Sequence, residues 1–217
     1  MPRIARAVAP GYPHHVTQRG NYRQIVFEDE EDFQQYKTWL KDYSGKFGLK
    51  IWAYCLMNNH VHFVCVPTKE YSLAKTFNTL HMRYSQYINR KKGAKGHLWQ
   101  GRFFSCSLDE IHLYAAVRYI ENNPVRAKIV KAPDDYKWSS TKGHINKEAD
   151  PILTGDCHLE TEIKDWRGYL IEKEDELLLD DIRKNSLTGR PCGTDAFIQK
   201  IEKILGRGLM AKVRGRP

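Results

Sequence analysis

Two histidines separated by one aliphatic residue, His60-Val61-His62, are the first residues in the sequence whose types and spacing could do chemistry. The apolar run at residues 63–66 follows them and is typical of a β-strand. Because side chains on a strand alternate between its faces, both histidines lie on one face and Val61 lies on the other. Two imidazoles spaced in this way can bind one cation, although an exposed sheet face can also carry such a pair without a metal. The pattern predicts a metal-binding strand that needs a third ligand.

A tyrosine and an asparagine four positions apart, Tyr119 and Asn123, supply further groups. A helix predicted over residues 109–123 places them on nearly the same face, whereas Tyr114 diverges from Tyr119 by roughly 140°. A phenol held beside a metal-polarised phosphodiester becomes a competent nucleophile once its proton is lost or shared. On the residues alone a purely structural role stays open for each side chain. Tyr119 can be an aromatic residue on the apolar side of an amphipathic helix, and Asn123 can be the C-cap of that helix before Pro124.

A divalent cation bound by two imidazoles and one amide oxygen keeps coordination positions open for phosphate oxygens. Such an ion neutralises the negative charge that develops when a phosphodiester is attacked. We expect Mg²⁺ or Mn²⁺ as the cofactor, because zinc binds more tightly and is less suited to phosphoryl chemistry. The predicted ligands are His60, His62 and Asn123.

The chain of 217 residues is long enough for one domain with appendages, and it is strongly basic. It carries 35 Lys and Arg residues against 26 Asp and Glu, a net charge of +9, which favours nucleic acid over a membrane surface as a partner. No apolar stretch approaches the ~20 residues that cross a bilayer, and the N-terminus lacks a secretory signal, so we expect a cytoplasmic protein. The five cysteines form no Cys-x-x-Cys pair, so we expect them to be reduced and buried.

Basic side chains gather in a loop at residues 19–23, in a second loop at residues 91–97, and at the C-terminus. The second loop is followed by Trp99, Phe103 and Phe104. Lysines for phosphates beside aromatic rings for unstacked bases are what a single-strand DNA surface needs. The alternative is a solvated loop next to a core strand, and we expect Phe103 or Phe104 in the core. The terminal Arg-Gly-Arg-Pro can lie in a narrow minor groove or be a disordered tail. The predicted DNA contacts are Arg19, Arg23, Lys91, Lys92, Lys95, Arg102, Arg214 and Arg216.

The elements that position these groups follow the order strand, helix, strand, strand, helix, strand. The sequence predicts strands over residues 14–20, 49–56, 60–66 and 98–106, and helices over residues 29–47 and 72–90. This is the order of the ferredoxin-like split βαβ sandwich, an α+β fold with an antiparallel sheet. His14 and His15 are adjacent on the first strand, so only one of them can face the site. The helix over 109–123 must end at or before Asn123, because Pro124 follows.

Four stretches of the sequence together resemble a known family, although no single one would suffice. They are residues 58–62 (Asn-Asn-His-Val-His), 99–103 (Trp-Gln-Gly-Arg-Phe), 117–127 (Val-Arg-Tyr-Ile-Glu-Asn-Asn-Pro-Val-Arg-Ala) and 136–140 (Tyr-Lys-Trp-Ser-Ser). The family is the single-tyrosine HUH transposases, and the most similar branch is the REP-associated tyrosine transposases. The resemblance runs from about residue 14 to residue 140.

The resemblance implies a covalent mechanism on single-stranded DNA, with hairpins formed by palindromic repeats as the substrate. Tyr119 would attack a DNA phosphate and give a 5′-phosphotyrosine intermediate and a free 3′-hydroxyl. His60 and His62 would be metal ligands, and Asn123 would take the third position, which in related enzymes is often a glutamine. Tyr114 has no counterpart role in the family.

The motifs end at about residue 140, and the remaining chain is predicted to be helical. We expect small helices over residues 160–182 and a short helix after residue 194, capped by Thr194 or Asp195. The predicted domains are a catalytic domain over residues 1–145 and a basic accessory DNA-binding region over residues 146–217.

The leading functional hypothesis is a metal-dependent single-stranded DNA endonuclease and strand transferase. One alternative is a non-catalytic DNA-binding protein on the same fold. A second is a metal-dependent hydrolase in which water is the nucleophile and Tyr119 is structural. The sequence leaves open the target DNA sequence and whether the protein acts as a monomer or as a homodimer.

Overall fold

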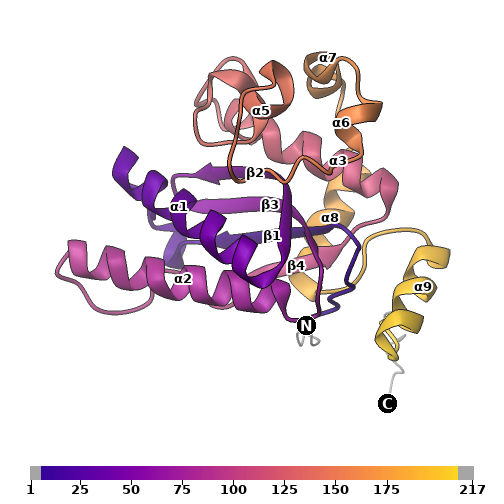
Figure 1. Ribbon diagram of the computed structural model, residues 1–217, viewed down its shortest axis with the longest axis horizontal. Helices are drawn as coiled ribbons and strands as arrows, with labels where there is room; N and C mark the ends of the chain where they lie inside the picture. The colour runs from indigo at the N-terminus through magenta and orange to yellow at the C-terminus, as the bar shows by residue number, and fades with distance from the viewer. Residues whose placement is uncertain (1–5, 210–217) are drawn as a thin grey trace.

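The structure is a computed structural model that describes residues 6–209. Within that range four strands form one antiparallel sheet in the order β2-β3-β1-β4 (Figure 1). The strands are β1 His14–Arg19, β2 Leu49–Met57, β3 His60–Pro67 and β4 Phe104–Ser107, and the helices between them are α1 Glu30–Phe47 and α2 Ser72–Lys91. This order confirms the predicted α+β fold of the ferredoxin-like split βαβ type.

Helices α1 and α2 lie together on one face of the sheet (Figure 1). Helix α1 begins after Asp29, whose carboxylate accepts a hydrogen bond from the backbone N–H of Asp32 at 3.1 Å. It ends at Gly48, which adopts the left-handed conformation with a φ of 64°. The apolar side of each helix packs onto the sheet and forms the first core cluster.

Strand β3 divides its side chains between two cores. Val61 and Phe63 are fully buried against α1 and α2, whereas Val64 belongs to the core cluster on the other face. In register, His62 lies opposite Thr17 of β1 and Cys55 of β2. The alternation predicted from the sequence is therefore present, and both histidines face away from α1 and α2.

Helices α3 Glu110–Glu121 and α8 Glu176–Thr188 pack against this opposite face. Val117 and Ile120 of α3 belong with Val64 to the second core cluster, and Ile182 of α8 joins them. The sheet therefore lies between two helical layers, and the histidine-bearing face is covered by helices from the C-terminal half of the chain (Figure 1).

Pro124 shapes the end of α3. The helix ends at Glu121, two residues earlier than the limit of the predicted helix, because proline has no N–H to donate and disfavours helical geometry before it. The chain then makes one further helical turn, α4 Asn123–Arg126, which the sequence analysis did not predict. Tyr119 and Asn123 are thus on successive helices rather than on one.

The last strand of the sheet is shorter than predicted. Strand β4 begins at Phe104, and Trp99 pairs only through an isolated bridge with Gly20. Gly101 adopts a φ of 145°, a conformation that favours glycine and interrupts an extended strand. Of the two aromatic residues expected in the core, Phe103 is buried and Phe104 is only partly buried.

The remaining elements are short. They are the 3₁₀ helices η1 Asn21–Arg23 and η2 Pro133–Asp135, and the helices α5 Thr141–Asn146, α6 Leu159–Glu162, α7 Trp166–Ile171 and α9 Asp195–Leu205. Helix α9 is capped by Thr194, whose hydroxyl oxygen accepts a hydrogen bond from Phe197 N at 3.3 Å, as predicted. All five cysteines are buried and free, which confirms the expectation of reduced packing residues. Across residues 6–209 the structure contains no helix that is both long and apolar enough to span a membrane.

Candidate functional site

The two histidines of β3 lie close together on the face covered by α3 and α8. Their ring centroids are 5.0 Å apart and the rings are nearly perpendicular, at 87°. The Nδ1 atom of His60 is 2.6 Å from the side-chain oxygen of Asn59, and the Nδ1 atom of His62 is 3.0 Å from Nε2 of His15. Because both Nδ1 atoms have partners, Nε2 is the ligand atom that each ring offers to a metal ion.

Tyr119 projects from α3 toward this pair. Its ring meets the ring of His62 edge-on, at 89° with the centroids 5.5 Å apart. Tyr114 lies elsewhere on the helix, where its hydroxyl donates a hydrogen bond to Glu162. The structure therefore separates the two tyrosines as the helical spacing predicts, and it brings Tyr119 to the histidines.

A pocket of about 310 Å³ opens beside this contact. It is lined by residues of β1, β3, β4, α3 and α8 and of the segment before β4, namely His15, Thr17, Arg19, His62, Gln100, Phe104, Tyr119, Arg183, Ser186 and Leu187. Of the two adjacent histidines on β1, His15 is the one that faces the site. Sequence analysis did not identify Arg183 and Ser186, since no motif marks α8 and only the packing of this helix brings them to the pocket.

The histidines of the site are held in their neutral form. Burial, together with the positive charge of Arg19, lowers the pKa of His60 to about 4. Burial and the neighbouring His60, His15 and Arg19 lower the pKa of His62 well below its usual value. A neutral imidazole is the form that binds a metal ion, so the site is prepared for one at neutral pH.

Two arginines flank the phenol of Tyr119. The guanidinium carbon of Arg126 is 5.1 Å from the centre of the Tyr119 ring, and that of Arg183 is 5.5 Å from it. Burial lowers the pKa of Arg183, but hydrogen bonding to Asp180 and contact with Tyr119 outweigh this and raise it. Each arginine also forms an ion pair, Arg126 with Glu174 and Arg183 with Asp180, so each would have to share or leave its carboxylate to bind a phosphodiester beside the tyrosine.

Asn123 is buried at the start of α4, with 8 % of its surface exposed. Its amide nitrogen has no hydrogen-bond partner among residues 6–209. An amide nitrogen donates hydrogen bonds and does not bind a cation, so the ligand atom of Asn123 would be its side-chain oxygen. The two neutral imidazoles fit a divalent cation by their chemistry, while the role of Asn123 as the third ligand stays a prediction.

The predicted DNA contacts fall in different environments. Arg19 lines the pocket, and Arg23, Lys95 and Arg102 lie on the exposed surface. Lys91 forms ion pairs with Asp29 and Asp32 at 2.7 and 2.8 Å, and Lys92 pairs with Glu28 at 2.6 Å. Arg214 and Arg216 lie outside the described residues. All eight DNA-binding roles stay predictions, and Lys91 and Lys92 would have to leave an acidic partner to bind a phosphate.

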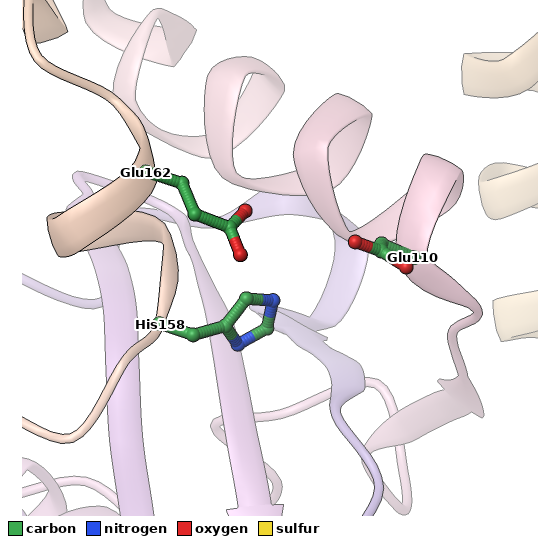
Figure 2. Close-up of side chains that lie close together, drawn as sticks. All are labelled: Glu110, His158 and Glu162. Carbon is green, nitrogen blue, oxygen red and sulfur yellow. The ribbon is translucent and has the colours of Figure 1, made fainter.

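A second group of ligand-type side chains lies at the other end of α3 (Figure 2). Ligand atoms of Glu110, His158 and Glu162 lie within 4.8 Å of one another, and all three residues are exposed. Glu110 is nine residues before Tyr119, which corresponds to roughly 13 Å along a helix. This group is therefore separate from the His60 and His62 site.

Comparison with known proteins connects this geometry to a family. Residues 10–123 match the family model described as "Transposase IS200 like", a stretch that contains β1, both histidines of β3, Tyr119 and Asn123. No curated protein matches the chain significantly.

Two solved structures are similar to the chain. One is described as "Structure of the REP associates tyrosine transposase bound to a REP hairpin", with 19% identity, 72% of this chain and 93% of that chain covered, and a TM-score of 0.54. The other is a putative transposase from Deinococcus radiodurans, with 20% identity, 56% of this chain and 97% of that chain covered, and a TM-score of 0.39. The first likeness supports the fold.

The family match extends over 114 of the 217 residues, more than half of the chain. It confirms the resemblance that the four motifs carry. The protein therefore belongs to the family of IS200-like transposases.

Proposed function

We propose that this transposase cuts and joins single-stranded DNA with Tyr119 as its nucleophile and a divalent metal ion as its cofactor. The observation that carries the proposal is the edge-on contact of Tyr119 with His62, whose ring centroids are 5.5 Å apart. The phenol lies against the neutral imidazole of His62, in a pocket that Arg19 and Arg183 also line, and this supports the proposal.

In this mechanism His60, His62 and Asn123 would hold Mg²⁺ or Mn²⁺, which when bound polarises the phosphate that is attacked. The hydroxyl oxygen of Tyr119 forms a bond to phosphorus while the bond from phosphorus to the 3′ oxygen breaks. The phenolic proton passes to solvent, and the leaving 3′ oxygen takes up a proton. The products are a 5′-phosphotyrosine and a free 3′-hydroxyl, which can attack the phosphotyrosine and rejoin the strand.

The substrate we propose is single-stranded DNA next to a hairpin. Arg19 and Arg183 supply positive charge for the phosphate, and Phe104 places an aromatic ring in the same pocket, where an unpaired base can stack. The solved transposase that shares the fold is described as bound to a REP hairpin, which supports a hairpin for this chain as well. The region over residues 146–217, which is basic from residue 181 onward, is proposed as an accessory DNA contact, and the cytoplasm as the location.

The decisive experiment compares the wild-type protein with Tyr119→Phe. Each protein is incubated with labelled single-stranded DNA that carries a palindromic hairpin, in Mn²⁺ or Mg²⁺, and is then denatured and separated by size. We expect a covalent protein–DNA adduct with the wild type and none with Tyr119→Phe, because phenylalanine has no attacking oxygen. Tyr114→Phe is the matched control, and it should form the adduct normally.

The other outcomes identify the alternatives. Cleavage of the DNA without an adduct indicates a hydrolase that uses water. Binding without cleavage indicates a non-catalytic DNA-binding protein. An adduct that persists in Tyr119→Phe excludes this tyrosine as the nucleophile.

A further inference from the structure

Three buried side chains from three elements form a hydrogen-bonded chain that ends at the metal-facing histidine. Ser186 Oγ of α8 is 2.7 Å from His15 Nδ1 of β1, and His15 Nε2 is 3.0 Å from His62 Nδ1 of β3. His15 and Ser186 are 2% and 3% exposed. The rings of His15 and His62 are nearly parallel, at 18° with the centroids 5.2 Å apart, and they meet edge to edge at this hydrogen bond. Solvent therefore has little access to either contact.

The number of protons in this chain allows two arrangements. A neutral imidazole has one N–H and one bare nitrogen, so each contact in the chain holds one proton. In the first arrangement His62 Nδ1–H donates to His15, and His15 Nδ1–H donates to Ser186 Oγ. His62 Nε2 is then bare and can bind a metal. In the second arrangement the donors and acceptors are exchanged: Ser186 Oγ–H donates to His15 Nδ1, and His15 Nε2–H donates to His62 Nδ1. His62 Nε2 then carries a hydrogen, which prevents it from binding a metal.

His60, the other predicted ligand, shows which of the two arrangements fits metal binding. His60 Nδ1 lies 2.6 Å from Asn59 Oδ1, which can only accept, while the Asn59 amide nitrogen donates to Arg23 O at 3.2 Å. His60 must therefore donate through Nδ1 and keep Nε2 bare. Only the first arrangement gives His62 the same form, with both Nε2 atoms ready for one ion.

The far end of the chain can also accommodate the first arrangement. Ser186 Oγ lies 3.3 Å from Cys106 Sγ, so when the hydroxyl accepts from His15 it can donate its own hydrogen to sulfur. Each polar atom from Cys106 to His62 then has a partner. This matters because a buried polar group without one costs about 1–3 kcal/mol.

We propose that His15 and Ser186 are positioning residues that hold His62 in the tautomer and orientation required for metal binding. The proposal rests on the proposed function of His62 as a ligand. It also makes α8 part of the catalytic site, although this helix lies outside the stretch that matches the transposase family.

The first test measures Mn²⁺ binding to the full-length protein without DNA, by the electron paramagnetic resonance signal of the free ion. We expect His15→Phe, which keeps a ring but has no acceptor, to weaken binding about ten-fold or more. His15→Gln, which restores an acceptor, should recover part of the loss. Ser186→Ala should weaken binding by a smaller factor, and Ser105→Ala should leave it unchanged, because the buried hydroxyl of Ser105 has no partner among residues 6–209.

The second test observes the tautomer directly, by ¹⁵N NMR of the histidine side chains in the metal-free wild type. We expect His62 to carry its proton on Nδ1 and to lose this preference in His15→Phe. Wild-type His62 protonated on Nε2, or unchanged Mn²⁺ affinity in a folded His15→Phe, would overturn the proposal. Neither readout needs Tyr119, so a failure of the covalent mechanism leaves both results interpretable.

Discussion

Asn123 shows how far spacing alone can predict the position of a candidate ligand. Its distance of four residues from Tyr119 predicted a shared helix face, but Pro124 starts a new helical turn at Asn123 itself. The side chain nevertheless stays buried, and its amide nitrogen lacks a partner within residues 6–209. On hydrogen bonding alone the ligand and the cap interpretations of Asn123 both stand, because the orphaned atom is a donor and a cation binds the amide oxygen.

We predict that Asn123→Ala weakens Mn²⁺ binding about ten-fold, because one of three protein ligands is lost. Asn123→Gln should bind more tightly than Asn123→Ala, since it restores an amide oxygen. The measurement is isothermal titration with Mn²⁺. Asn122→Ala is the neighbouring control, because the amide of Asn122 already donates to Leu170 O, at 2.6 Å. Equal affinity of Asn123→Ala and the wild type would exclude Asn123 as a ligand.

The residues found from the sequence share a property that His15, Arg183 and Ser186 lack. His60, His62 and Tyr119 stand in short runs in which local periodicity sets the face of each side chain. Arg183 and Ser186 reach the pocket only because α8 packs on β4 and α3. The sequence indicates that either His14 or His15 faces the site. The contact between His15 and His62, however, depends on the pairing of β1 with β3.

At the scale of elements, a buried carboxylate fixes the end of α3 that carries Tyr119. Glu121 is fully buried and accepts hydrogen bonds from Ser140, from His144 Nδ1 at 2.6 Å and from Trp166 Nε1 at 2.8 Å. Burial lowers the pKa of His144, but the negative charges of Glu121 and Glu160 outweigh it and raise the pKa. The network joins α3 to α5 and α7, so these C-terminal helices hold the end of α3 with Tyr119 in place.

We predict that Glu121→Ala lowers the free energy of unfolding by about 3–5 kcal/mol, because it leaves the buried groups of Ser140, His144 and Trp166 without their acceptor. Urea denaturation followed by circular dichroism measures the change. Glu110→Ala, at the exposed start of the same helix, should change the free energy by less than about 0.5 kcal/mol. A similar loss of unfolding free energy in both variants would show that substitutions in α3 destabilise the protein in general, and not through the Glu121 network.

Element boundaries were predicted best where one signal acts alone. The acidic start of α1 and the glycine after it define that helix, and both are visible in the sequence. Strand β4 was predicted too long, because aromatic residues near Trp99 suggest a strand while Gly101 interrupts it. The burial of the histidine-bearing face could not be predicted, since it depends on contacts between residues that are 80 and 171 positions apart in the sequence.

At the scale of the whole molecule, the core holds histidines away from water on both faces of the sheet. Burial is the largest cause that lowers the pKa of each, to about 4 for His14, His15 and His60 and to about 3 for His81. An unfolded chain would expose these imidazoles with ordinary pKa values near 6.5. The folded state therefore excludes protons that the unfolded state accepts.

This difference fixes the sign of a pH dependence. Between pH 6.5 and 4 the unfolded chain binds more protons than the folded chain, so the free energy of unfolding must fall as pH falls. Each histidine contributes up to about 1.4 kcal/mol for each unit by which its pKa is lowered. The contribution is fully present above pH 6.5. His144 and His112, whose pKa values are raised, act in a different window: their contribution is fully present below pH 6.5 and is lost as the pH rises above it.

We predict that the midpoint of urea unfolding falls steeply from pH 7 to pH 4.5, as measured by tryptophan fluorescence without metal. His81 tests the cause, because it lies away from His60 and His62 and its Nε2 is 2.9 Å from the hydroxyl of Tyr36. His81→Gln keeps a polar partner for that hydroxyl but cannot take up a proton, so it should make the pH dependence shallower by one histidine's share. Stability that stays constant over this range would mean that the imidazoles gain water or a charged partner on acidification, and the neutral state inferred for His60 and His62 would then fail as well.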